Sequence, residues 1–166
     1  MLDRVPLAYP ALEKELILEI AMAIHNEYNK QRLSERPDVP LEHPRWDELP
    51  LDLKTSNIDQ AEDIPEKMNI IGCFVSPKKE NMVHVISFEK EELEILAIRE
   101  HERWVEERKA SGWVYGEVKD VARKMSPYIA PWDDIPDEIK KYDEEAVVNI
   151  IPLLNKANLC VYRKNP

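Results

Sequence analysis

Histidines and cysteines are the side chains of this sequence best suited to metal binding or nucleophilic chemistry. The four histidines are spread along the chain without close pairing, at His25, His43, His84 and His101. His101-Glu102 lacks the second histidine four residues on that a metalloprotease helix needs. Neither Cys73 nor Cys160 has an activating neighbour in sequence, and no Gly-x-Ser-x-Gly turn, phosphate-binding glycine loop or calcium-binding loop occurs. These patterns predict a protein without catalytic activity, metal site or cofactor.

A different pattern points to binding. An Ala-x-x-x-His-x-x-aromatic motif occurs at residues 21–28 and again at residues 97–104, ending in Tyr28 and in Trp104. Two equivalent rings could stack on a flat, electron-poor ligand such as a purine, at roughly 1–3 kcal/mol for each stacked base. Arg108, one turn after Trp104, could bind the phosphate of such a ligand. Core packing is an equally good interpretation of both rings, so the two alternatives stay open.

The histidines of this motif have two interpretations as well. His25 and His101 fall on apolar helix faces, where a buried imidazole that fixes packing is the default and orientation of a ligand is the alternative. The other candidate ligand contacts are loop aromatics or polar residues near helix starts, where loop anchoring, capping and surface charge are the defaults. They are Trp113, Tyr115, Asn57, Lys140 and Asp143.

Helices are expected to position these residues. Apolar residues at helical spacing predict four helices, at 10–34, from 55–57 to 71 with a bend at Pro65, at 89–110, and from about 135 to 154. The proline-rich segment 36–53 and the segment 113–134 are predicted to be loops. Short apolar runs predict a β-hairpin formed by 73–76 and 82–88, with a last strand at 159–163 beside it.

A second sequence motif also occurs twice along the chain. Trp46-Asp-Glu-Leu-Pro recurs as Trp132-Asp-Asp-Ile-Pro, and the same offset pairs Lys54 with Lys140 and Asn57 with Asp143. Two homologous helix pairs related by an approximate twofold axis are the simplest packing that this register predicts. Such an axis could bring the two motif rings to opposite walls of one cleft.

These residues carry a resemblance to the RyR domain of ryanodine receptors and bacterial proteins. The similarity to one repeat covers about 93–163, and 20–75 is similar to a diverged second copy. The sequence departs from the family pattern in that the first half has no Gly-Trp-x-Tyr-Gly loop and Ser126 stands where a histidine is common. The fingerprint comprises Leu96-Ala97, His101-Glu102-x-Trp104, Gly112-Trp113-x-Tyr115-Gly116, Asp120, Pro127, Pro131-Trp132-Asp133-Asp134-Ile135-Pro136, Lys140 and Asp143.

The repeat and the resemblance together predict a mainly α fold. We expect a single RyR-type domain over 1–166, with a first repeat at about 10–76, a β-hairpin link at about 71–88 and a second repeat at about 89–163. The two repeats are expected to be related by a pseudo-twofold axis and to carry a small antiparallel sheet of short strands. The family resemblance implies recognition rather than catalysis.

Charge and composition restrict the partners and the compartment. The formal net charge of −10 argues against binding to nucleic acid or to an anionic membrane. Residues 1–10 lack the apolar core of a signal peptide and the apolar runs are too short to span a bilayer, which favours a cytoplasmic protein. We expect a ligand-binding or sensor module that takes a nucleotide-like molecule in a cleft between its repeats. The alternative is an interaction module, in which the acidic helix at 89–107 docks a basic protein or a second copy.

Overall fold

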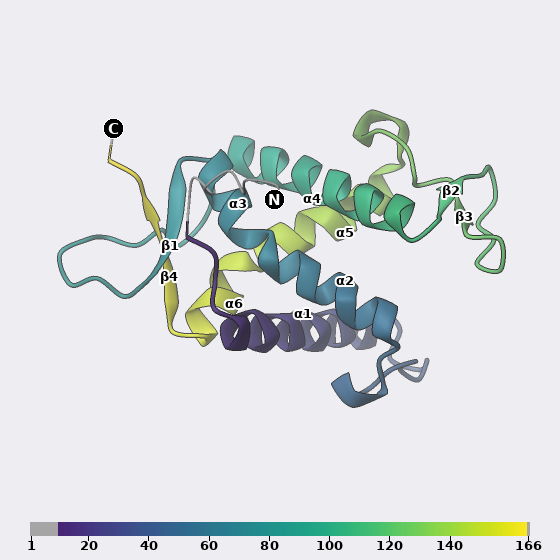
Figure 1. Ribbon diagram of the computed structural model, residues 1–166, viewed down its shortest axis with the longest axis horizontal. Coiled ribbons are helices and arrows are strands. Elements are labelled where there is room, and N and C mark those ends of the chain that lie inside the picture. The colour runs from purple at the N-terminus through teal and green to yellow at the C-terminus, as the bar shows by residue number, and fades with distance from the viewer. Residues whose placement is uncertain (1–9, 166) are drawn as a thin grey trace, which may run out of the picture. The chain divides into compact units, whose positions relative to one another are not determined.

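A computed structural model describes residues 10–165, so the segment considered above for a signal peptide lies largely outside the described residues. The fold is mainly α, as predicted, with a small two-stranded antiparallel sheet (Figure 1). The chain divides into two compact units. The first unit comprises Met1–Ile86 with Ile151–Pro166, and the second comprises Ser87–Ile150. Across the described residues no helix combines the length and apolar character needed to span a bilayer.

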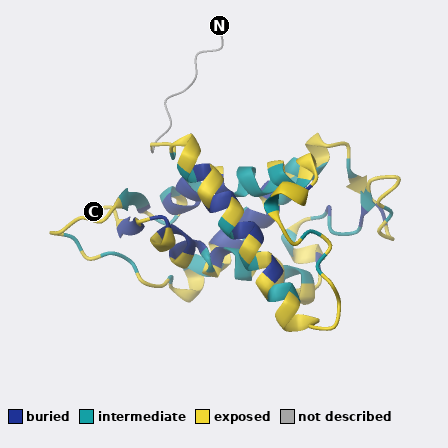
Figure 2. Cartoon of the chain, turned by 90° about the horizontal axis from the view of Figure 1, so that it is seen from below, coloured by how far each residue is buried: buried dark blue, intermediate teal, exposed yellow. Residues whose placement is uncertain are grey.

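The first unit begins with two packed helices, α1 (Lys14–Glu35) and α2 (Leu51–Glu62). The apolar stripe of α1 is buried, as Figure 2 shows for helices that are dark on one side and yellow on the other. Its buried apolar residues are Ile17, Ile20, Ala21 and Ile24. The prolines between the helices prevent a continuous helix, and the connection ends in a short 3-10 helix, η1 (Trp46–Glu48).

The bend predicted at Pro65 is a break between two helices. α2 ends at Glu62, and α3 (Ile64–Ile70) begins at once with Pro65 in its first turn. Proline suits that position because the first N–H groups of a helix have no intrahelical acceptor. Gly72, at a φ of 72°, ends α3 and leads into β1 (Cys73–Pro77).

The predicted β-hairpin is wrong. β1 pairs antiparallel with β4 (Leu159–Arg163), and residues 82–88 form no strand. The reason is burial: β4 carries four consecutive buried residues, whereas Val83 and Ile86 are 92% and 78% exposed. Removing the β4 side chains from water outweighs the local advantage of a hairpin.

Val85, within this segment, nevertheless contacts the sheet. Lys164 N–H donates to the Gly72 carbonyl. In an antiparallel ladder, hydrogen-bonded and non-hydrogen-bonded pairs alternate. Counting from the pair of Gly72 and Lys164, Val75 and Val161 form a non-hydrogen-bonded pair. The Val161 carbonyl therefore points away from β1 and accepts a hydrogen bond of 2.7 Å from Val85 N–H. This contact covers part of the outer edge of β4.

The second unit is a helix pair with an inserted loop. α4 (Lys90–Ala110) packs against α5 (Asp137–Val148), and a 3-10 helix, η2 (Trp132–Asp134), precedes α5. Between α4 and η2, β2 (Val114–Tyr115) and β3 (Met125–Ser126) form a two-stranded parallel sheet. The last predicted helix is also divided: α5 ends at Val148 and α6 (Ile150–Lys156) follows.

Local structure follows the register of the sequence repeat. Four pairs of elements are separated along the chain by the same number of residues as Trp46 and Trp132. They are η1 and η2, α2 and α5, α3 and α6, and β1 and β4. Both breaks between short helices have the same backbone conformation, with φ and ψ of −79° and −9° at Asp63 and of −78° and −8° at Asn149. The equivalent strands β1 and β4 pair with the equivalent residues Val75 and Val161 opposite each other, so the pairing is symmetric about a local twofold axis.

Candidate functional site

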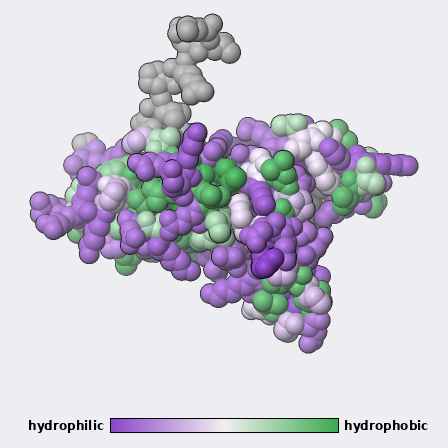
Figure 3. Space-filling model, turned by 60° about the horizontal axis from the view of Figure 1, so that its bottom comes forward, coloured by the Kyte–Doolittle hydropathy of each residue, from purple (hydrophilic) through white to green (hydrophobic). Residues whose placement is uncertain are grey.

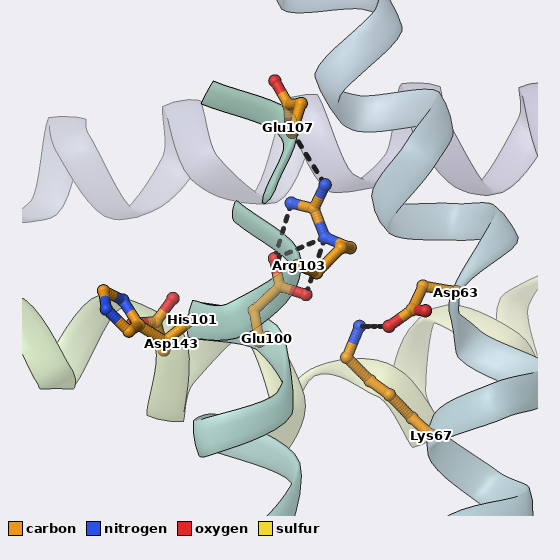
Figure 4. Close-up of polar contacts among 7 residues, drawn as sticks. All are labelled: Asp63, Lys67, Glu100, His101, Arg103, Glu107 and Asp143. Carbon is orange, nitrogen blue, oxygen red and sulfur yellow. Dashed lines mark hydrogen bonds and ion pairs between the residues drawn. The ribbon is translucent and has the colours of Figure 1, made fainter. Parts of the chain in front are cut away.

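The second unit places His101 at the centre of a set of predicted site residues. The ring lies on α4, 3% exposed, and its Nε2–H donates to the Ala130 carbonyl at 2.7 Å. Its Nδ1 lies 3.5 Å from Oδ2 of Asp143 on α5, and Figure 4 shows the two side chains side by side. Because a carbonyl can only accept, Nε2 carries a proton, and a second proton on Nδ1 is favoured by the facing carboxylate.

Opposing effects set the protonation of this pair. Burial alone would lower the pKa of His101, but the hydrogen bonds to Asp143 and to the Ala130 carbonyl leave that pKa above its ordinary value. Burial raises the pKa of the Asp143 carboxyl, and its hydrogen bond with His101 only partly offsets the rise. The geometry therefore favours a protonated histidine beside a carboxylate.

Aromatic rings surround this pair. The His101 ring stacks on Trp104 with centroids 6.0 Å apart and planes at 23°, and it lies 5.9 Å from Trp132 of η2. Lys140 Nζ lies 5.3 Å from the centroid of the Trp132 ring. Four of the predicted site residues, His101, Trp104, Lys140 and Asp143, thus occupy one region of the second unit.

Arg108 extends this region to the end of α4. Its Cζ lies 5.5 Å from the ring centroid of Trp104 and 5.5 Å from that of Trp113. Trp113 reaches this position because Gly112, at a φ of 87°, ends the helix and Trp113 N–H bonds back to the Arg108 carbonyl at 2.9 Å. The Nε of Arg108 is buried and has no hydrogen-bond partner among the described residues. We call His101, Trp104, Arg108 and Trp113 the aromatic–basic cluster.

The remaining predicted site residue of this unit lies elsewhere. Tyr115 belongs to β2 and is 57% exposed, so its ring does not anchor the loop to a core. The loop is held instead by polar contacts, among them Lys124 Nζ to the Ser111 carbonyl at 2.8 Å. Ser126, which stands where the family commonly has a histidine, is buried and accepts a hydrogen bond from Tyr128 N–H at 3.2 Å.

The first unit holds the corresponding histidine in a neutral environment. Asn29 Nδ2 donates to Nε2 of His25 at 3.1 Å and to the His43 carbonyl at 3.0 Å, so Nε2 of His25 acts as an acceptor. Burial lowers the pKa of His25, and the hydrogen bond with the backbone of His43 only partly opposes this effect. Trp46 meets the His25 ring edge-on at 6.2 Å.

The other two predicted residues of the first unit are not core residues. Tyr28 on α1 is 53% exposed, which excludes core packing as its role. Asn57 lies on α2, half-buried, within the helix and not at its start.

Sequence reasoning missed a buried charged network on α4. Arg103 donates to both carboxylate oxygens of Glu100, at 2.8 to 3.2 Å, and to Glu107 at 2.9 Å (Figure 4). Glu100 and Arg103 are 4% and 7% exposed. Charged residues on a helix are expected at the surface, although the repeat carries a signal to the contrary: Glu100 precedes His101 as the buried Ile24 precedes His25. Burial opposes the charge of Arg103, but the two carboxylates raise its pKa.

The first unit has a buried ion pair of its own. Lys67 Nζ lies 2.9 Å from Oδ2 of Asp63, four residues earlier in the chain, and the Lys67 side chain is 2% exposed. Over residues 10–165 no group of three histidine, cysteine or acidic side chains is placed to hold a metal ion. Both cysteines are buried and form no disulfide.

Comparison with known protein families matches the RyR domain over residues 64–163. The chain therefore belongs to the RyR domain family. The match begins in α3 and ends in β4, so it contains the whole aromatic–basic cluster. No curated protein matches the chain.

Proposed function

We propose that this chain is a non-catalytic binding or sensor module that takes a nucleotide-like small molecule at the aromatic–basic cluster. One observation carries the proposal: the Arg108 guanidinium lies against two indole rings while its buried Nε has no hydrogen-bond partner among the described residues. A buried donor without an acceptor is costly, at about 1–3 kcal/mol. An anionic group of a ligand would satisfy it.

The cluster offers both kinds of contact that a nucleotide needs. The indoles of Trp104 and Trp113 supply flat apolar faces for a base, and stacking on one ring contributes roughly 1–3 kcal/mol. Arg108 supplies a planar, permanently charged donor for a phosphate. His101 adds positive charge beneath Trp104, held there by Asp143 and by the Ala130 carbonyl.

The same geometry supports a role without catalysis. A general base needs a ring nitrogen that is available to a substrate proton. The Nε2 of His101 is bonded to a backbone carbonyl and its Nδ1 faces Asp143, so both nitrogens serve the protein structure. The net charge of −10 and two cysteines without a disulfide support the further proposal of a cytoplasmic protein.

Titration calorimetry with AMP, ATP and cyclic AMP tests the proposal. We expect one of them to bind, and Trp104→Ala to weaken that binding about 10-fold or more through lost stacking. Tyr142→Ala is the matched control, because it removes an exposed aromatic ring of the same unit outside the cluster. Absence of heat with all three nucleotides, together with an unchanged melting temperature, would refute the function.

A protein-interaction module is the second candidate, and one observation favours it. Four apolar residues are exposed on the loop of the second unit that contains β2: Val114, Tyr115, Val118 and Val121. Figure 3 shows hydrophobic atoms among hydrophilic ones at the right of the view, the side on which Figure 1 draws this loop. Sedimentation velocity over a concentration series tests self-association, which Val118→Asp should abolish. A monomer at all concentrations would exclude a homodimer.

A further inference from the structure

The stacking surface that the proposed function requires is already occupied. The Arg108 guanidinium lies over the rings of both Trp104 and Trp113, and the His101 ring packs on Trp104 as well. An indole ring has two faces, so a base that stacks fully on Trp104 competes with the side chains already there. One of them has to move for the ligand to bind.

Arg108 is held by fewer polar contacts than His101. His101 is 3% exposed and is anchored by Ala130 and Asp143. Arg108 has no hydrogen bond or ion pair from its guanidinium to any described residue, and contact with the indoles is what holds it. Such cation–π contacts are weak when partly exposed, and an ionic hydrogen bond to phosphate is stronger.

We propose that Arg108 covers the stacking surface until the anionic group of the ligand draws the guanidinium off the indoles. The site then accepts only molecules that carry a flat ring and a phosphate together. A nucleoside lacks the group that moves Arg108, and inorganic phosphate lacks the ring that replaces it. This inference rests on the proposed function and names its ligand class as phosphorylated aromatic compounds.

Calorimetry with AMP, adenosine and inorganic phosphate tests the inference on the wild-type protein and Arg108→Gln. Wild type should bind AMP at least about 10-fold more tightly than adenosine, because one ionic hydrogen bond is lost. In Arg108→Gln the adenosine affinity should rise about 2- to 5-fold, since no cation competes for the indoles. AMP should then bind no better than adenosine.

Arg108→Lys is the matched control, because it keeps the charge and removes the planar group that lies on the rings. It should retain part of the preference for AMP and also bind adenosine more tightly than wild type does. Thermal unfolding of each variant verifies that the fold is intact. The Nε–H resonance of Arg108 gives a direct readout: at equal ligand concentration it should shift with AMP and shift much less with adenosine.

The outcomes separate the two proposals. If wild type binds AMP and Arg108→Gln leaves adenosine affinity unchanged or lower, Arg108 does not cover the site, and the inference fails while the function stands. Equal binding of adenosine and AMP by wild type also refutes the inference, and it shows in addition that Arg108 does not bind the phosphate. If wild type binds neither compound, the proposed function fails and the inference fails with it.

Discussion

The two repeats hold the same histidine in opposite electrostatic states. In the first, His25 accepts a hydrogen bond from Asn29 and its pKa is lowered. In the second, His101 faces Asp143 and its pKa is raised. The helix and the nearby tryptophan are alike in both, so the difference comes from the polar neighbours.

The same contrast extends along the first helix of each repeat. Where α1 buries the apolar Ile24, α4 buries Glu100 together with Arg103. A duplicated framework thus tolerates either an apolar or a charged interior, provided that each charge has a partner. The charged version lies in the repeat that carries the aromatic–basic cluster, the site proposed above for ligand binding.

The largest expected effect on stability comes from removing the cation of the buried charge network on α4. Arg103→Met removes the cation between Glu100 and Glu107, and we expect a loss of about 3–5 kcal/mol in the free energy of unfolding. The double variant Glu100→Ile with Arg103→Met places the isoleucine of α1 at position 100, removes both buried charges and should cost less than Arg103→Met alone. Urea unfolding at neutral pH measures both. A double variant less stable than the single one would contradict the view that the two interiors are interchangeable.

Asp143→Asn should have a moderate, pH-dependent effect on stability, because it makes the environment of His101 resemble that of His25. The raised pKa of His101 means that its contribution to stability is fully present below the ordinary value of 6.5 and is lost as pH rises through the folded-state pKa. In Asp143→Asn burial prevails and the pKa falls. Stability is then lost as pH falls below the ordinary value, as for His25.

Histidine titration by NMR and urea unfolding between about pH 5.5 and pH 8 measure this reversal. His25→Gln is the control in the other repeat: its cost relative to wild type should shrink toward acid pH, because a histidine with a lowered pKa stabilises only in its neutral form. If the pKa of His101 stays raised in Asp143→Asn, the carboxylate is not its cause.

The smallest effect concerns the turn that precedes each strand. Gly72 before β1 and Asn158 before β4 occupy equivalent positions at φ values of 72° and 60°. Gly72→Asn therefore copies the second repeat and should cost less than about 1 kcal/mol, since asparagine tolerates this conformation. Gly72→Val should cost more, because its Cβ is branched. Thermal unfolding ranks the two variants, and equal costs would show that backbone conformation does not limit the choice of residue here.

Sequence patterns located the helical regions, the repeated motifs and the family, but they missed the start of α2 at Leu51, inside the predicted loop 36–53, and the division of the last predicted helix at Asn149. The helices and strands that follow the Trp46 motif are separated from those that follow the Trp132 motif by a constant number of residues. Local structure repeats in this way because caps, prolines and apolar spacing act over a few residues. The proximity of His101 to Asp143 also has a sequence signal, since both belong to the family fingerprint on neighbouring helices.

Only the tertiary structure decided which distant groups meet. β1 pairs with β4 and not with 82–88, because burial of Val161 and Tyr162 depends on the whole sheet and not on the adjacent turn. The burial of Glu100 and the position of Arg108 over Trp113 are likewise invisible to local periodicity. A charged side chain is expected in water unless partners compensate its loss of hydration. The partner Arg103 lies one turn from Glu100 on α4, but only the fold shows that both side chains are buried.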